Sequence, residues 1–248
     1  MATCPQAMRT ANPTLRADSL TSATLIPSAK PMTLDGTVQK SFLLATITVL
    51  AGAVSWRFAG NLGVPVALIA SLAAFIVCVV CCLEKEWSPV LAPVYAVLKG
   101  LALGFFSALF ERIYHGIVLQ AVMLTFGTFF ALLAAYSTRL IKPSENFKLG
   151  IAAATGGIGL VYLATIVLGL FGVQVPLIHS SGWIGIAFSA AVVTIAALNL
   201  VLDFDFIEDG CESGAPKYLE WYAAFGLLVS LVWLYVEILR LLAKLRDR

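Results

Sequence analysis

The chain has 248 residues, of which 60% are hydrophobic and only 12% are charged. An ordinary soluble domain carries about 25% charged residues, so this composition argues against a soluble globular enzyme, and its high hydrophobicity excludes a disordered chain. The formal net charge of +2 comes without a basic stripe, which argues against a nucleic-acid partner. A polytopic α-helical membrane protein remains, with the lipid bilayer as its surroundings.

Residues 1–40 form a polar tail that is rich in Thr, Ser, Ala and Pro. The tail lacks the apolar core of a cleavable secretory signal, so we expect it to be a cytosolic tail. Its last part, residues 32–40, is expected to be helical and to continue into the first membrane-spanning helix. Met8 begins the sequence MRTANPTLR and is an alternative start to Met1.

Apolar segments long enough to cross a membrane follow the tail. A transmembrane helix needs about 20 apolar residues, and an open sheet cannot span a bilayer, so we expect helices here. The sequence therefore predicts an all-α polytopic membrane protein, with residues 41–248 as its seven-helix domain. The segments cover residues 41–60, 64–83, 90–110, 116–136, 149–172, 183–206 and part of 218–243.

The distribution of Lys and Arg predicts the orientation of the chain in the membrane. These residues gather in the tail and in alternate loops, whereas the loops at 61–63 and 173–182 carry none, so the N-terminus is expected to be cytosolic. Seven full crossings would place the C-terminal cations on the outer side, which conflicts with this rule. These cations are Arg240, Lys244, Arg246 and Arg248.

Small residues predict two surfaces for close helix packing, because in lipid such residues let backbones approach one another. The first surface, on the third helix, consists of Gly100, Gly104 and Ala108. The second, on the fifth helix, consists of Gly156, Gly157 and Gly159.

Three of the five cysteines lie in the run VCVVCC and are interpreted as helix-packing residues. A zinc site is not expected, because the only histidines, His115 and His179, lie far from these cysteines in sequence. The loop HSSG at 179–182 places serine beside histidine but lacks the context of a nucleophile elbow. We therefore expect neither an enzyme nor a cofactor.

Ionisable side chains inside the apolar segments are costly in lipid, so each requires a reason. Lys99 lies in the third segment and Glu111 closes it, while Asp203 and Asp205 lie near the end of the sixth. Glu237 lies deep in the seventh segment. Solvation at the membrane surface would explain Glu111 and Asp205. A structural pair would explain Asp203 and Glu237, and a pH-sensing ion pathway would explain all the acids.

Asn199 lies one helical turn before Asp203 and shares its face, whereas Asp205 points about 200° away. If Asp203 and Glu237 met in a low dielectric, they could not both ionise cheaply and would share one proton. An ion path through such a pair would be closed when the pair shares the proton. It would open or bind a cation when both carboxyls ionise, and Asn199 could complete a transient calcium site. No permanent metal site is predicted.

Several separated motifs occur in a recognisable order. They are EKEWSPVLAPVYAVLKGLALG, GIVLQAVMLTFG, AATGGIGLVYL and the C-terminal stretch that begins LDFDFIEDG and ends LAKLR. Together they resemble the bacterial branch of the Bax inhibitor family. The resemblance implies six helices around a central C-terminal helix in a bacterial inner membrane. It also implies a pH-regulated calcium leak.

The resemblance assigns roles to individual residues. The acidic pair of the family matches Asp203 in LVLDF and Glu237 in LYVEILRLL, where the family often has aspartate. Its basic latch residue best matches Lys85. Lys99 stands where the bacterial branch often has an acid, so it would neutralise the pore carboxylates.

The assigned pair raises a problem of depth, because Glu237 lies about 28 Å into its helix while Asp203 lies near a helix end. The problem disappears if residues 216–222 lie at the interface, the last span starts near Ala223, and the sixth helix continues toward Glu208. A different class of function is a membrane interaction protein that regulates membrane proteolysis or the stress response. The tail would bind its partner, and a membrane-anchored protease is one such partner.

Overall fold

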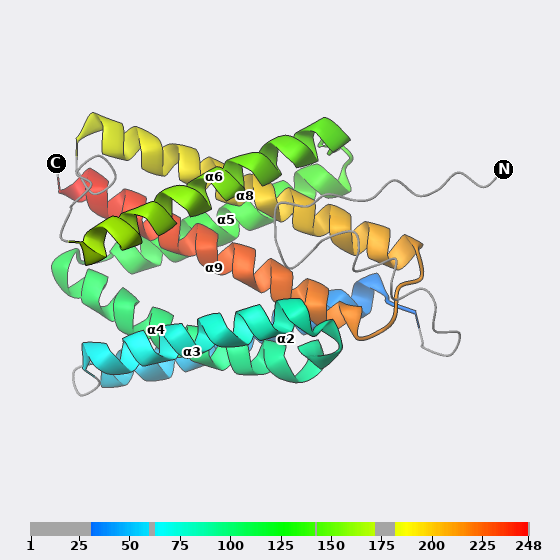
Figure 1. Ribbon diagram of the computed structural model, residues 1–248, viewed down its shortest axis with the longest axis horizontal. Coiled ribbons are helices and arrows are strands. Elements are labelled where there is room, and N and C mark those ends of the chain that lie inside the picture. Colours follow the sequence, from blue (N-terminus) through cyan, green and yellow to red (C-terminus); the bar gives the residue numbers. More distant parts are fainter. Residues whose placement is uncertain (1–30, 60–62, 142, 172–181, 248) are drawn as a thin grey trace.

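The computed structural model describes residues 31–59, 63–141, 143–171 and 182–247. Within these ranges, seven helices are long and apolar enough to cross a membrane, which confirms the expected all-α polytopic fold (Figure 1). A short 3-10 helix, η1 (Lys85–Trp87), joins the second and third of them. The seven are α2 (Leu34–Phe58), α3 (Val64–Leu83), α4 (Ser88–Ile113), α5 (Ile117–Ser137), α6 (Glu145–Leu170), α8 (Trp183–Glu212) and α9 (Leu219–Arg246).

Most of the helices extend beyond the apolar segments, because polar residues at their ends cap them or continue them. α2 begins at Leu34, where the Thr33 hydroxyl accepts a hydrogen bond from the Gly36 amide at 3.2 Å. The last part of the predicted tail is therefore helical, as expected for residues 32–40, and residues 1–30 lie outside the described ranges. α8 continues to Glu212, which confirms the expected extension of the sixth helix.

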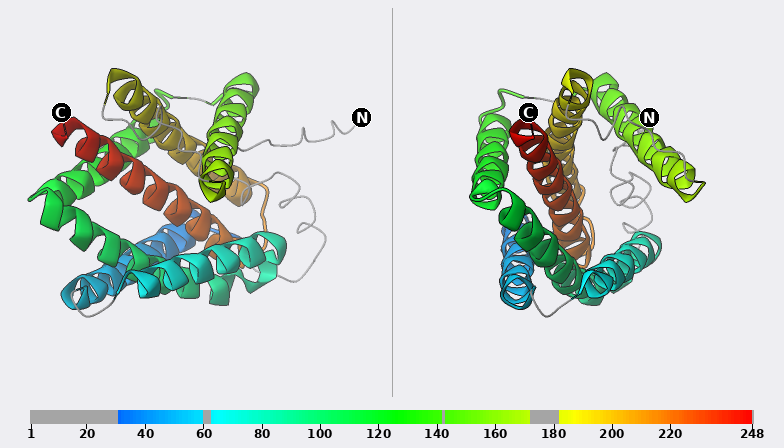
Figure 2. Two further views of the ribbon diagram at one scale, coloured as in Figure 1. Left: turned by 60° about the vertical axis from the view of Figure 1, so that its left-hand side comes forward. Right: turned by 90° about the vertical axis from the view of Figure 1, so that its left-hand side faces the viewer.

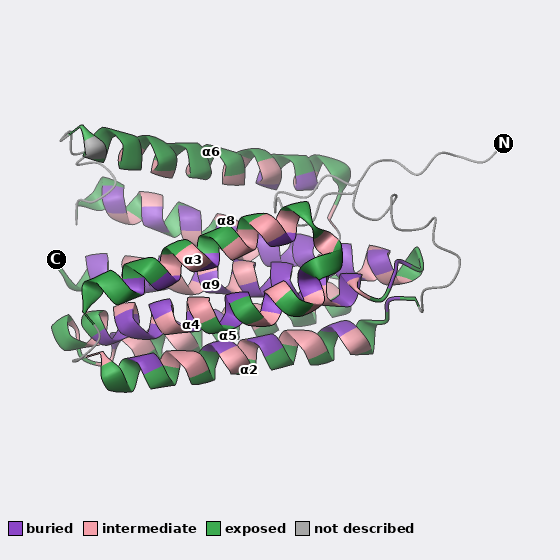
Figure 3. Cartoon of the chain, turned by 60° about the horizontal axis from the view of Figure 1, so that its bottom comes forward, coloured by how far each residue is buried: buried purple, intermediate pink, exposed green. Residues whose placement is uncertain are grey.

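α9 occupies the centre of the bundle (Figure 2). It packs against α8, α2, α5 and α4, while α3 packs mainly on α4 and α6 packs on α8 in an outer position. Figure 3 shows the resulting contrast: α9 is buried along much of its length, whereas α6 is mostly exposed. The expected central C-terminal helix is thus confirmed, with α3 and α6 farther from it than the other helices.

Glycine contacts bring α2 and α4 together along their backbones. A Cβ atom at Gly104 would overlap the main-chain oxygen of Gly52, and one at Gly100 would overlap that of Thr48. Only glycine allows such an approach, and close approach supplies the dispersion energy that drives helix association in lipid. The first predicted packing surface is confirmed.

The second predicted packing surface is wrong. A Cβ atom at Gly156, Gly157 or Gly159 would meet no atom within 4 Å, so these glycines of α6 face outward. The face of α6 that does reach the bundle carries Thr155 and Tyr162, which are seven residues apart and therefore share one side of the helix.

Candidate functional site

Buried polar side chains line α8 and α9 inside an otherwise apolar bundle. Asn199 and Asp203 are buried in α8, and Glu220, Glu237 and Lys244 are buried in α9. Each would be costly in a membrane without partners, so their partners indicate what the region can do.

Glu237 forms a compact cluster with two residues, which we call the Glu237 cluster: Glu237, Tyr162 and Arg240. The Tyr162 hydroxyl, on α6, donates a hydrogen bond of 2.9 Å to Glu237 Oε1. Arg240 Nη1 donates to both carboxylate oxygens of Glu237, at 3.1 and 3.3 Å, and to the Tyr162 hydroxyl at 2.9 Å. The Arg240 guanidinium also lies 5.3 Å from the centre of the Tyr162 ring. The Glu237 charge is therefore compensated, and α6 is attached to α9 at this point.

The other cations at the C-terminal end of α9 are also bound within the protein. Lys244 Nζ donates to the main-chain oxygen of Gly185 at 3.1 Å and to the Ser189 hydroxyl at 2.7 Å, both near the start of α8. Arg246 Nη1 donates to the main-chain oxygen of His115 at 2.7 Å. Cations are favourable at a helix C-terminus, so these residues have a structural role that the loop-charge rule does not consider. Arg248, the last of these cations, lies outside the described ranges.

Glu220 is the centre of a second cluster, which we call the Glu220 cluster: Glu220, Thr33, Lys40 and Lys217. The amide and the hydroxyl of Thr33 each donate to Glu220 Oε1 at 2.9 Å. Lys40 forms an ion pair with the other oxygen, and Lys217 Nζ lies 4.0 Å from Oε1. The carboxylate thus sits at the positive N-terminal end of α2. Sequence reasoning missed Glu220, because a glutamate in the first turn of a helix is normally exposed.

The turn between α8 and α9 is attached to the start of α2 by its main chain. The Met32 amide donates to the Ala215 oxygen at 2.6 Å. The turn is also attached to α4, because the hydroxyl of Ser88, the first residue of α4, donates to the Tyr218 oxygen at 3.1 Å. Burial, with the nearby Glu86 carboxylate, raises the pKa of Tyr218, so its phenol stays protonated.

The helix α9 includes the last residues of the segment that was expected to lie at the interface. The helix begins at Leu219, four residues before the expected start of the last span at Ala223. Glu220 and Tyr222 are fully buried within the protein, and the interfacial depth of residues 216–222 stays a prediction.

Asp203 and Glu237 lie at different depths in the bundle. α8 and α9 run in opposite directions from their short turn, with Asp203 nine residues before Glu212 and Glu237 eighteen residues after Leu219. At 1.5 Å per residue, the two positions differ by about 13 Å along the helix axes. The extension of α8 reduces the predicted mismatch in depth but does not remove it. This offset argues against direct sharing of one proton between these carboxyls.

The other predicted residues of α8 connect it to α6. The Asn199 amide donates to the Thr155 hydroxyl and to the main-chain oxygen of Ile195, both at 2.8 Å. Asp205 forms an ion pair of 2.5 Å with Lys148, in the first turns of α6. Asp205 thus lies at the α6 contact and has a neutralising partner.

The remaining acid and the two predicted cations lie outside the α8–α9 region or at its edge. Glu111 accepts hydrogen bonds from the amides of Gly116 at 2.5 Å and Val118 at 3.2 Å, so it caps α5. Lys85, in η1, lies 5.9 Å from the centre of the Tyr222 ring at the start of α9.

Lys99 is half-buried in α4 and lies near Cys78 of α3. The expected role of Lys99 in neutralising Asp203 and Glu237 stays a prediction. The described residues contain no group of three His, Cys, Asp or Glu that could hold a metal ion. Residues 179–181 of the HSSG loop lie outside the described ranges.

Two partners in the Glu237 cluster escaped the sequence analysis. The three-residue spacing of Glu237 and Arg240 places them on one helix face, and this signal could have revealed their pairing. Tyr162 carried no such signal, because its contact with α9 depends on how α6 packs.

Comparison with known proteins identifies the family that the sequence matches. The model of a protein family described as Bax inhibitor 1 like matches residues 8–247, which is almost the whole chain. No curated protein matches the chain significantly in sequence.

Proposed function

The chain belongs to the Bax inhibitor 1 like family, and we propose that it acts as a pH-sensitive cation leak that carries calcium. The observation behind the proposal is that Asp203 and Glu237 are buried on two adjoining membrane-spanning helices. Ionisable groups inside a membrane are costly, and proteins that retain them commonly use them in ion pathways. Carboxylate oxygens are also the ligands that calcium prefers.

The contacts of Glu237 correspond to a closed state of such a leak. Tyr162 and Arg240 occupy the carboxylate, so a cation can bind Glu237 only after these contacts open. Tyr162 belongs to α6, the outer helix with the fewest buried residues in its span. In this proposal, a displacement of α6 from α8 and α9 opens the path.

The difference in depth gives the two acids separate roles. At about 13 Å apart along the helix axes, they cannot bind one ion together, so calcium would pass from one to the other. Protonation removes the negative charge that attracts the cation. We therefore expect the flux to be smaller at acidic pH than at alkaline pH.

Calcium flux into proteoliposomes, followed with an enclosed fluorescent indicator from mildly acidic to mildly alkaline pH, tests the proposal. Wild-type protein is compared with Asp203→Asn and Glu237→Gln, each of which keeps the side-chain shape and removes the charge. Glu212→Gln is the matched control, because Glu212 is an exposed acid at the end of α8.

The expected result is a pH-dependent flux that both buried substitutions flatten and the control leaves intact. Absence of flux at every pH, with a working channel in parallel vesicles, would overturn the proposal. The absence of flux would instead favour the interpretation that the protein acts by binding partners in the membrane. An unchanged pH profile in both buried variants would show that the pH dependence of the flux does not come from these acids.

A further inference from the structure

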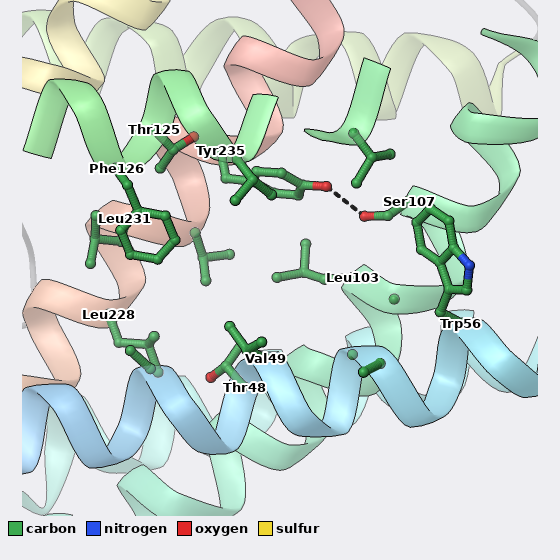
Figure 4. A pocket seen from close by; sticks show the side chains of 17 residues that line it. Thr48, Val49, Trp56, Leu103, Ser107, Thr125, Phe126, Leu228, Leu231 and Tyr235 are labelled. Carbon is green, nitrogen blue, oxygen red and sulfur yellow. Dashed lines mark hydrogen bonds between the residues drawn. The ribbon is translucent and has the colours of Figure 1, made fainter. Parts of the chain in front are cut away.

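An apolar cavity of about 540 Å³ lies between α2, α4, α5 and α9, away from the buried charges (Figure 4). Its wall includes Val49 of α2, Leu103 of α4 and Leu231 of α9, and Phe126 of α5 closes one side. The volume lies within the range of about 300–1,000 Å³ that is typical of ligand-binding pockets.

The hydroxyl groups in the cavity wall have partners within the protein. The Ser107 and Tyr235 hydroxyls bond one another at 2.7 Å, as the dashed line in Figure 4 shows. The hydroxyls of Thr48 and Thr125 donate to main-chain oxygens one turn earlier in their own helices, at 2.9 and 2.7 Å. A water molecule needs two to four polar partners to occupy a buried site. The wall therefore favours a hydrocarbon over water or a polar ligand.

The length of the cavity matches one leaflet of a bilayer. Its α2 wall runs from Ala45 to Trp56, which is about 17 Å at 1.5 Å per residue. The hydrocarbon core of a bilayer is about 30 Å thick, so one leaflet accounts for about half of that length. Trp56 lies near the end of α2 and is 39% exposed, as suits an aromatic residue at the membrane surface.

The cavity opens sideways between α2 and α5. α2 packs along α4 and α9, and α5 packs along α9 and α8, but α2 and α5 do not pack along one another. At this gap, Val49 and Phe126 line the cavity and are also exposed on the outer surface of the bundle. A chain from the surrounding bilayer can therefore enter without first passing through water.

We propose that this cavity binds one acyl chain of a membrane phospholipid, which enters between α2 and α5. The apolar wall, the internally satisfied hydroxyls, the leaflet length and the lateral opening all fit a single extended hydrocarbon chain. The headgroup remains at the level of Trp56.

Photolabelling tests the proposal on the full-length protein in vesicles. Phosphatidylcholine with a diazirine near the end of one acyl chain is included in the bilayer, and labelled residues are mapped by peptide mass spectrometry. Leu103 and Leu231 report on the cavity, because both are half-buried on inner helices. Ile166, on the outer face of α6, reports on ordinary lipid contact because it is 64% exposed.

Two variants fill the cavity from opposite walls: Ala53→Phe on α2 and Val122→Phe on α5. The matched control is Ala131→Phe, an exposed position of α5 that does not line the cavity. We expect each filling variant to reduce the labelling of Leu103 and Leu231 several-fold relative to Ile166. The control should retain wild-type labelling, and thermal unfolding of each variant identifies any that fail to fold.

Three outcomes would overturn the proposal. The first is labelling of Ile166 without labelling of Leu103 and Leu231. The second is equal labelling in wild type and in a folded filling variant. The third is labelling of Leu103 and Leu231 by free palmitate with the same diazirine but not by the phospholipid, which would identify a fatty-acid site instead.

Discussion

On one side of α9, α2 and α4 approach backbone to backbone at Gly52 and Gly104, whereas on the other side α6 reaches α9 through the hydroxyl of Tyr162. The first side also contains the Glu220 cluster, in which a fully buried carboxylate holds the start of α2. The second side has outward-facing glycines, and α6 is attached there by side-chain hydrogen bonds and by the ion pair between Lys148 and Asp205.

The two sides of α9 are therefore held together by different kinds of contact. Close backbone packing depends on a short distance between the two helices. Its dispersion energy is lost as soon as the helices separate. Hydrogen bonds between helices in membranes contribute only about 0.6 kcal/mol each on average, so a helix that is attached by a few such bonds and one ion pair separates more easily than one packed backbone to backbone. α6 is therefore the helix whose displacement we associate with opening.

The largest expected effect comes from breaking the glycine contact. Gly104→Leu would drive a side chain into the backbone of α2, and we expect a loss of about 4 kcal/mol or more in unfolding free energy. Unfolding in mixed micelles by SDS titration measures this loss. Wild-type stability would show that α2 and α4 are not in close contact.

The Glu220 cluster gives the next largest expected effect. Glu220→Ala leaves Lys40 without its ion-pair partner and the Thr33 donors without their acceptor, and we expect a loss of about 3 kcal/mol. The same SDS titration applies. Glu220→Gln serves as the control, because it can keep the hydrogen bonds from Thr33 and should lose less. Equal losses in both variants would assign the whole effect to the lost charge and none of it to the hydrogen bonds from Thr33.

A smaller effect is expected from Tyr162→Phe, which removes the hydroxyl that joins α6 to Glu237. We expect a loss of about 1 kcal/mol in stability, together with a higher basal calcium flux in proteoliposomes. Thr165→Val is the matched control, because the Thr165 hydroxyl bonds only within α6 among the described contacts. A flux that stays at the wild-type level would argue against α6 as the gate.

The smallest effect is expected from Gly157→Leu, the counterpart of Gly104→Leu on the opposite side of α9. A side chain at Gly157 meets open space, so stability should change by no more than about 0.5 kcal/mol. SDS titration again supplies the value. A loss comparable to that of Gly104→Leu would mean that α6 packs through its glycines after all.

The candidate site was only partly predictable. Asp203 and Glu237 could be found as acids inside apolar segments, because their cost in lipid requires an explanation wherever they lie. Their separation depends on where α8 ends and α9 begins, and the apolar pattern of the sequence does not specify those ends. Glu220 looked like an ordinary first-turn acid, since its buried position arises from contact with residues about 180 positions away.

The sequence by itself determined the number of membrane-spanning helices, the family and the presence of buried acids, because hydropathy and motif order are local properties of the chain. The tertiary structure alone decided which glycines pack, which acids are neutralised and where the apolar cavity lies. Those features depend on the rotation and position of each helix against its neighbours. A helix face is apolar or small in sequence whether it meets lipid or protein, so only the assembled bundle distinguishes Gly104 from Gly157.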